Sequence, residues 1–193
     1  MPRIIAGRFG GRVIDSPPKQ DLRPMMSKVR AALFDMLTHL EALYGDVLDL
    51  YAGSGAVGLE ALSRGMEMAY FVELNPVSTR TIQQNLAKLG VAKQGHVHRY
   101  KVENVIAKPD LLHHKKPFEL VTVTPPYAEV DYIDLAERIA ESKLIAAGSV
   151  VVFEHPRQAV LAEEIGPLVR LRNRKYGRTH LSIYEYPVEI GEW

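Results

Sequence analysis

A glycine-rich turn after a short apolar strand restricts the folds open to this chain more than any other feature. Residues 46–51 predict a buried strand, and the turn that follows leads into a helix. The turn has the spacing G-x-G-x-x-G, formed by Gly53, Gly55 and Gly58. A second strand is expected over residues 68–73, which places Glu73 at its end, 20 residues after Gly53. This order of strand, turn, helix and strand-end carboxylate is typical of a Rossmann-like nucleotide-binding sheet.

The rest of the chain continues the alternation of strands and helices. Further strands are expected over residues 96–100, 118–124, 149–154, 169–174 and 180–186. Further helices are expected over residues 27–45, 75–90, 132–146 and 159–165, with Ser27 and Asn75 as caps. This alternation predicts an α/β fold with a mostly parallel seven-stranded sheet, helices on both faces and an antiparallel edge. We expect one domain over residues 1–193, in which residues 1–26 form a β-hairpin (Arg3–Ile14) and a linker appended to the core.

The composition excludes several classes of protein. The chain has 193 residues and no cysteine, so disulfides, iron–sulfur clusters, Cys-ligated zinc and cysteine nucleophiles are excluded. The histidine pairs His96/His98 and His113/His114 lack the spacing of a metal site, and we expect no metal. No apolar run approaches the roughly 18 residues of a membrane span, and the first residues lack the apolar core of a secretory signal. We therefore expect a cytoplasmic protein with no membrane partner.

Positive charge is concentrated in two segments. The formal net charge is only +1, but residues 1–30 hold seven lysines and arginines against two acidic residues. Residues 157–180 hold six lysines and arginines against two acidic residues. Two basic segments in a nearly neutral chain indicate a local contact with a polyanion, whereas solvated surface charge is the alternative. The expected phosphate contacts are Arg3, Arg8, Arg12, Arg23 and Arg30, extended by Arg172, Arg174, Lys175 and Arg178.

Two carboxylates near the glycine-rich turn indicate the kind of ligand. Glu73 can accept hydrogen bonds from both hydroxyls of a ribose. Asp49 stands at the carboxyl end of the first strand, where a carboxylate would repel a pyrophosphate and attract a cationic ligand. S-adenosylmethionine is cationic at its amino group and its sulfur, and is therefore favoured as the cofactor. A nicotinamide dinucleotide is the alternative.

The segment Thr124-Pro125-Pro126-Tyr127 ends the fourth predicted strand, at the edge where open α/β sheets bind ligands. Prolines lack N–H groups and hold the backbone extended, so neighbouring carbonyls can serve as fixed acceptors. Tyr127 adds a flat ring for stacking. An exocyclic amino group on a nucleic-acid base presents two N–H donors, and this loop suits its recognition. A rigid turn without a chemical role is the alternative.

In combination, these segments resemble the bacterial small-subunit (16S) ribosomal RNA (guanine-N2)-methyltransferases of the RsmD type. The resemblance covers nearly the whole chain. Its segments are Arg3–Gly7 with Gly11-Arg12, Arg23-Pro24 with Val29–Phe34, Asp49–Gly65, Phe71–Glu73, Pro125–Tyr127, and Tyr176-Gly177 with Leu181-Ser182. It implies a Rossmann-like, S-adenosylmethionine-dependent enzyme that methylates the exocyclic N2 amino group of a guanine, without a metal and without a covalent intermediate.

The resemblance also implies site residues. Those expected at the cofactor are Asp49, Tyr51, Gly53, Ser54, Gly55, Glu73, Leu74 and Glu103. Those expected at the target base, in the catalytic loop, are Thr124, Pro125, Pro126 and Tyr127.

Three positions depart from the family pattern, and the simplest is Met25, where the family usually has Thr. The family carries Asp at the position of Thr124, and a neutral hydroxyl is a weaker acceptor than a carboxylate. Stabilisation of charge at such a point is worth about 10²–10³ in rate. Thr124 therefore indicates a slow enzyme, a compensating acceptor elsewhere, or lost activity. Lys101 stands where members often place an Asp near the adenine, and Glu103 or Asn104 is the candidate substitute.

Three functions remain open from the sequence. The first is the ribosomal RNA (guanine-N2)-methyltransferase, with small-subunit ribosomal RNA or the assembling small subunit as partner and a monomer as the expected state. The second is a methyltransferase for an amino group on another nucleic-acid base, such as adenine in DNA. The third is a non-catalytic relative that binds RNA or cofactor, for which Thr124 is the reason.

Overall fold

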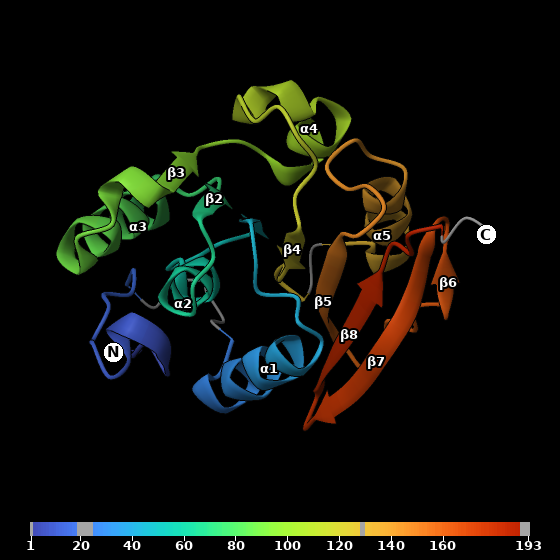
Figure 1. Cartoon of the computed structure of the whole chain (residues 1–193), viewed down its shortest axis with the longest axis horizontal. Coiled ribbons are helices and arrows are strands. Elements are labelled where there is room, and N and C mark those ends of the chain that lie inside the picture. Colours follow the sequence, from blue (N-terminus) through green and yellow to red (C-terminus); the bar gives the residue numbers. More distant parts are fainter. Residues whose placement is uncertain (1, 19–24, 128–129, 190–193) are drawn as a thin grey trace.

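A mixed β-sheet forms the centre of the computed structural model, which describes residues 2–18, 25–127 and 130–189 (Figure 1). Within these residues the sheet has eight strands in the order β3-β2-β1-β4-β5-β8-β7-β6. The parallel strands are β1 (Asp46–Leu50), β2 (Met68–Val72), β3 (Gly95–His98), β4 (Leu120–Val123) and β5 (Val150–Pro156). The antiparallel strands are β6 (Glu164–Ile165), β7 (Leu168–Tyr176) and β8 (Thr179–Glu185).

Helices cover both faces of the sheet (Figure 1). They are α1 (Ser27–His39), α2 (Ala56–Ser63), α3 (Pro76–Leu89), α4 (Val102–Ala107) and α5 (Tyr132–Ala140), with the 3-10 turns η1 (Gly7–Phe9), η2 (Ala92–Gln94) and η3 (Pro109–Leu112). Leu120 of β4 packs in one core with α1, α2 and α3, whereas the next residue, Val121, packs in a second core with α4 and α5. Neighbouring strand residues point to opposite faces, so both cores form on one sheet. None of the described helices has the length and apolarity that a membrane crossing requires.

The strand order places a crevice between β1 and β4. From β1 the chain builds outward through β2 to β3, and it then returns to add β4 and β5 on the other side of β1. In open α/β sheets this reversal leaves a crevice at the carboxyl ends of the strands, where ligands bind. The predicted α/β fold, with its mostly parallel sheet and antiparallel edge, is confirmed.

The structure differs from the prediction at the antiparallel edge, which has one more strand than expected. The helix expected over residues 159–165 does not form, and this segment contains the edge strand β6. Ile165 pairs with Leu168 across a tight turn in which Gly166 adopts a φ of 54°. Both apolar side chains are thereby buried, while Val160 stays 77% exposed. Pairing with β7 therefore outweighs the weak helical pattern.

The N-terminal segment follows a hairpin path but has less β-structure than expected. Arg3 and Val13 form an isolated antiparallel bridge, and the turn between them is the 3-10 turn η1. The backbone N–H of Ile4 donates to the carbonyl of Arg12 over 3.0 Å. Because Gly7 and Gly11 adopt φ angles near 80°, the chain reverses before a regular strand pair can extend.

Helix ends match the prediction in part. Asn75 caps α3, since its Oδ1 accepts from the N–H groups of Val77 and Ser78. Ser27 is the first helical residue of α1 rather than its cap, and Met26, which precedes it, gives no side-chain cap. The helices α1 and α5 end at His39 and Ala140, earlier than expected.

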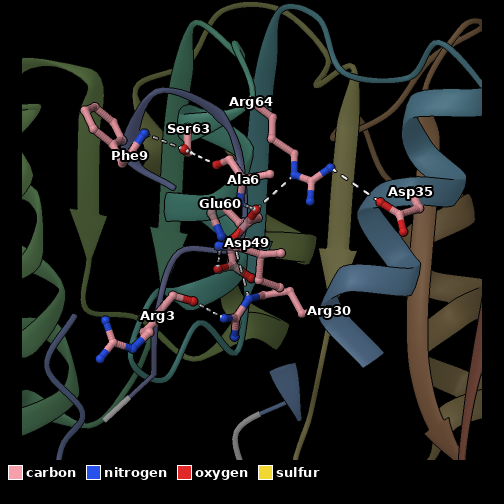
Figure 2. A network of polar contacts seen from close by, with 11 residues as sticks. Arg3, Ala6, Phe9, Arg30, Asp35, Asp49, Glu60, Ser63 and Arg64 are labelled. Carbon is pink, nitrogen blue, oxygen red and sulfur yellow. Dashed lines mark hydrogen bonds and ion pairs between the residues drawn. The ribbon is translucent and has the colours of Figure 1, made fainter. Parts of the chain in front are cut away.

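Glu60 of α2 fastens the N-terminal segment to the core (Figure 2). Its carboxylate accepts from the backbone N–H groups of Ile5 (2.7 Å) and Ala6 (3.0 Å) and from Nε of Arg64 (2.9 Å). Nε of Arg30 lies 3.8 Å from Oε2 of Glu60, and both side chains are almost completely buried. One buried carboxylate therefore fixes the direction in which residues 2–18 leave the sheet.

Candidate active site

A cavity of about 1250 Å³ opens at the carboxyl ends of the parallel strands, where the strand order predicts a crevice. Its wall includes residues that follow β1, β2 and β4, together with the end of β5 and the N-terminal segment. Ten residues expected at the site line it: Tyr51, Gly53, Ser54, Glu73, Leu74, Glu103, Thr124, Pro125, Pro126 and Tyr127. The fold thus brings the glycine-rich turn and the Pro-Pro loop to one cavity.

Glu73 is held in the cavity wall by two backbone groups. Its Oε2 accepts from the N–H of Gly53 over 2.8 Å, and its Oε1 accepts from the N–H of Asn75 over 2.8 Å. The side chain is 9% exposed. A carboxylate offers about four lone-pair positions, so these two bonds orient Glu73 and leave acceptor capacity toward ligand hydroxyls.

Tyr51 and Glu103 form another part of the wall. The Tyr51 hydroxyl donates to Oε1 of Glu103 over 3.1 Å, which joins the end of β1 to the first turn of α4. Burial strongly raises the pKa of Tyr51, and the neighbouring Glu103 carboxylate raises it further, so the phenol stays protonated. The Tyr51 backbone has a φ of 60°, which turns the chain sharply into the glycine-rich segment. Lys101 also lines the cavity.

The Pro-Pro loop is attached at both ends. Thr124 is half-buried, and its hydroxyl donates weakly to the Tyr51 carbonyl over 3.4 Å. The Pro125 carbonyl accepts from the Tyr132 hydroxyl over 3.5 Å. At the far end, the Tyr127 hydroxyl pairs with Oγ1 of Thr179 at the start of β8. The loop is therefore tied to β1, α5 and β8.

Sequence reasoning did not place Asp15 or Glu154 in this cavity, and Glu154 is the one that lies beside the Pro-Pro loop. Glu154 near the end of β5 lines the wall, is 9% exposed and lies 3.5 Å from the Tyr127 hydroxyl. The available signal was its place at the end of the fifth strand, which shares its edge with the Pro-Pro loop. The neighbouring His155 is buried, and its Nε2 lies 2.9 Å from Oγ of Ser182. Burial lowers the pKa of His155, which keeps this imidazole neutral.

A family model described as Conserved hypothetical protein 95 matches residues 2–185. The chain belongs to this family. Among its relatives, "Putative rRNA methyltransferase YlbH" of Bacillus subtilis is 33% identical over 184 residues, which cover 95% of this chain and 98% of that protein. Ribosomal RNA small subunit methyltransferase D of Escherichia coli K12 is 37% identical over 125 residues, which cover 65% of this chain and 60% of that protein.

A solved structure of a hypothetical protein from Thermus thermophilus has the same fold, with a TM-score of 0.81 and 31% identity. The match covers 96% of this chain and 99% of the Thermus protein. Family membership together with these relatives confirms the resemblance to ribosomal RNA methyltransferases seen in the sequence, and the Thermus structure confirms the fold.

Asp49 and Gly55 have another role in this member of the Conserved hypothetical protein 95 family than the expected cofactor contact. Asp49 is completely buried beneath α2 and does not line the cavity. Its Oδ2 accepts from the N–H of Gly58, and its Oδ1 accepts from the Thr122 hydroxyl, each over 3.0 Å. Burial raises the pKa of Asp49 to about 7. Gly55, with a φ of 77°, caps α2 behind the wall.

Close packing explains the last glycine of the turn. A Cβ on Gly58 would lie 2.4 Å from the ring of Phe71, so only glycine allows α2 to approach β2 this closely. Asp49 and Gly58 together hold the first turn of α2 against the sheet. The positive end of the helix dipole lies at this turn and stabilises a carboxylate there. They shape the cavity from behind and do not line it.

The predicted RNA contacts fall into three groups. Arg3, Arg8 and Arg12 are exposed on the N-terminal segment. Arg30 is 1% exposed, and its Nη2 donates to the Arg3 carbonyl over 2.6 Å, so the expected RNA contact for Arg30 is wrong. The Arg30 guanidinium instead forms an ion pair with the buried Glu60 carboxylate (Figure 2). Arg23 lies outside the described residues.

The turn that carries Arg8 lies away from the cavity. The N–H of Phe9 donates to Oγ of Ser63 at the end of α2, and Nη2 of Arg8 donates to Gln94 just before β3. Both partners stand at the amino-terminal edge of the parallel strands. Pro2 and Asp15, by contrast, line the cavity, so the N-terminal segment runs from one edge of the sheet to the other and back.

The β7–β8 tip lies at the cavity edge. Thr179 pairs with Pro156 at the end of β5, and the N–H of Arg157 donates to the Arg178 carbonyl. The exposed cations of this tip are Arg157, Arg174, Lys175 and Arg178, and the predicted contact Arg172 is exposed farther from the tip on β7. Burial lowers the pKa of His180, and the positive charges of Lys175 and Arg157 lower it further. The electrostatic potential at the tip is therefore positive. Among the described residues, no group of three acidic or histidine side chains could hold a metal ion.

Proposed function

We propose that this protein is an S-adenosylmethionine-dependent methyltransferase that modifies ribosomal RNA, with the exocyclic N2 amino group of a small-subunit guanine as its target. The observation that carries this proposal is the shared cavity: Glu73 and Gly53 lie in the same wall as Thr124 and Tyr127. One part suits a nucleoside cofactor, and the other suits a flat base with an amino group. The names of the relatives support the coarser part of this proposal, which is methylation of ribosomal RNA.

The residues present fit the cofactor. Glu73, fixed by Gly53 and Asn75, can accept from the two ribose hydroxyls. The Leu74 side chain next to it can pack against the adenine, and the Tyr51–Glu103 pair forms another part of the wall. When bound, S-adenosylmethionine supplies an electrophilic methyl group: the amine nitrogen forms the new N–C bond while the C–S bond breaks, and its electron pair stays on the sulfur of S-adenosylhomocysteine.

Thr124, Pro125, Pro126 and Tyr127 would hold the base. Tyr127 is fixed by Thr179 and offers one ring face for stacking. The Thr124 hydroxyl and the proline carbonyls can accept from the amino group, although the Pro125 carbonyl already accepts from Tyr132. The nitrogen would shed its second proton to solvent after transfer. Positioning supplies much of the rate in such a reaction, and a base in a loop or bulge costs least to turn outward.

RNA phosphates would be contacted at two places. Arg157, Arg174, Lys175 and Arg178 at the β7–β8 tip stand beside the Pro-Pro loop, and can hold the backbone near the target base. Arg3, Arg8 and Arg12 lie on the N-terminal segment, where they can meet a more distant part of a large RNA. Such contacts position the RNA and do not select the base. We propose a monomer that acts in the cytoplasm on the assembling small subunit or its RNA.

The test is methyl transfer from radiolabelled S-adenosylmethionine to unmodified small ribosomal subunits and to their free RNA, followed by nucleoside analysis. Label in N2-methylguanine is the expected result. Label in another methylated base would identify a different target. Cofactor binding without transfer to either substrate would select the non-catalytic relative, which Thr124 favours.

Variants of Tyr127 sharpen this test. Tyr127→Leu removes the stacking ring, and should lower transfer about 10-fold or more while cofactor binding stays unchanged, since stacking is worth about 1–3 kcal/mol per base. Tyr127→Phe keeps the ring and should retain more activity. Tyr44→Leu is the matched control, because Tyr44 is 52% exposed and lies outside the cavity wall.

A further inference from the structure

We infer that Glu154 is the carboxylate that reads the target guanine, in place of the Asp that is missing at position 124. This inference rests on the proposed function, because it assumes that a guanine enters the cavity. Glu154, Thr124 and Tyr127 would together form a subsite that accepts hydrogen bonds from the base. Such a subsite explains how a chain with a neutral Thr124 can recognise an amino group.

Strand register brings Glu154 beside Thr124. The pair Val123 and Phe153 are partners in the parallel ladder between β4 and β5. Thr124 follows Val123, and Glu154 follows Phe153, so these two residues are the next pair along the two strands. Val123 and Phe153 both point into the core under α4 and α5, so the following residues turn to the opposite face together. Both line the cavity, and a carboxylate at 154 therefore faces the space that one at 124 would face.

The carboxylate of Glu154 is buried and makes a weak contact with Tyr127. The side chain is 9% exposed, so the surrounding water competes little for its oxygen atoms. Its Oε1 lies 3.5 Å from the Tyr127 hydroxyl, which also pairs with Thr179. The residue that would stack on the base therefore also contacts the residue that would read the base edge.

The chemistry of the bases selects guanine at such a carboxylate. Guanine alone among the four RNA bases presents two neighbouring donors on its pairing edge, N1–H and N2–H₂. Two oxygen atoms of one carboxylate can accept both, in a pair of charge-assisted hydrogen bonds. Adenine and cytosine would each set a ring-nitrogen acceptor against a carboxylate oxygen, and uracil offers a single donor. A negative charge at this position also stabilises the positive charge that develops on N2 during transfer.

The first experiment compares Glu154→Gln with the wild type on the substrate identified by nucleoside analysis. We expect kcat/KM for methyl transfer to fall about 10- to 100-fold, since one oxygen acceptor becomes an amide donor that opposes a guanine N–H. The Kd for S-adenosylmethionine should stay within twofold. Glu137→Gln, an exposed position on α5, is the matched control and should behave as the wild type.

A rescue variant separates recognition from a structural role. In the Glu154→Gln background, Thr124→Asp should raise kcat/KM at least 10-fold, because it returns a carboxylate to the same space from the neighbouring strand. A second probe replaces the target guanine by 2-aminopurine, which keeps the amino group and lacks N1–H. The wild type should lose at least 10-fold on this base, and Glu154→Gln less than threefold, because a Gln amide can donate to the bare N1.

The outcomes distinguish this inference from the proposed function. Wild-type rates in Glu154→Gln, or no recovery with Thr124→Asp, would overturn the role of Glu154 while methyl transfer by the wild type stands. No N2-methylguanine from the wild type would overturn the proposed function itself. If Glu154→Gln does not fold, Glu154→Asp decides: the retracted carboxylate must lower transfer with unchanged cofactor affinity, and an unchanged rate would overturn the inference.

Discussion

The backbone N–H of Gly53 donates to Oε2 of Glu73 over 2.8 Å and so joins the turn after β1 to the end of β2. The two residues are 20 positions apart in the chain and lie in the same cavity wall. This bond orients the Glu73 carboxylate toward the cavity. The other carboxylate near the glycine-rich turn, that of Asp49, is buried behind the wall.

Substitution of Glu73 should therefore act on the cofactor. In Glu73→Gln, an amide N–H₂ replaces one oxygen and can no longer accept from Asn75 or from a ribose hydroxyl. We expect the Kd for S-adenosylmethionine to rise at least 10-fold, as measured by isothermal titration calorimetry. Glu67→Gln, an exposed position just before β2, is the control. Equal affinity in Glu73→Gln and the wild type would contradict the assignment.

Loss of the Glu60 carboxylate should destabilise the fold. Glu60→Ala leaves the buried Arg30 guanidinium without its anion and frees the N–H groups of Ile5 and Ala6. Breaking a buried ion pair by removal of one partner costs about 3–5 kcal/mol. Urea unfolding should show this loss as a lower midpoint, whereas Glu41→Ala, on an exposed turn, should leave the midpoint unchanged. A Glu60→Ala midpoint equal to that of the wild type would mean that the network is not stabilising.

The raised pKa of Asp49 predicts a pH dependence of stability. A carboxyl group with a native pKa of about 7 binds a proton more tightly than in the unfolded chain. Its contribution to stability is therefore present at low pH and is lost as the pH rises toward 7. Over this range the loss amounts to at most about 4 kcal/mol.

Asp49→Asn isolates this contribution, because an amide oxygen can still accept from Gly58 and the amide N–H₂ can donate to Thr122. Thermal unfolding between pH 4 and 8 should show the wild type losing stability relative to Asp49→Asn as the pH rises. A constant difference between the two proteins would contradict the raised pKa.

The two basic surfaces should contribute unequally to catalysis. Arg174→Glu with Arg178→Glu alters the tip beside the Pro-Pro loop, whereas Arg8→Glu with Arg12→Glu alters the distant turn of the N-terminal segment. Both pairs should weaken RNA binding and reduce its salt slope by about 1–2, as expected for two phosphate contacts. Only the first pair should also lower kcat for methyl transfer. If neither pair changes the salt slope, the RNA contacts lie elsewhere.

Local patterns in the sequence were sufficient to predict the central fold. The apolar runs of β1, β2 and β4 are bounded by glycine, Asn-Pro or Pro-Pro, so both the strands and their ends could be recognised. The edge strand β6 could not, because its two residues gain their conformation only from pairing with β7. A two-residue strand leaves no periodic pattern.

The sequence predicted those site residues that follow directly after strands. It predicted less well whether a side chain is exposed to the cavity or buried in the fold. Glu73 and Tyr127 follow strands and line the cavity as expected. Asp and Arg commonly bind ligands at the surface, so the residue types of Asp49 and Arg30 gave no sign of burial. In the structure, helix α2 covers Asp49, and Arg30 forms a buried ion pair with Glu60. Glu154 was missed because its partner Tyr127 is 27 residues away in sequence and meets it only across β4 and β5.

The contact between Tyr127 and Thr179 has a consequence for synthesis of the protein. The walls that suit the cofactor are built from residues that emerge from the ribosome up to Glu103, whereas the loop that suits the base is fastened by the first residue of β8. The part of the cavity that suits the base therefore cannot take its final form on a nascent chain before β8 has begun to be made, although β8 is the last strand in the sequence.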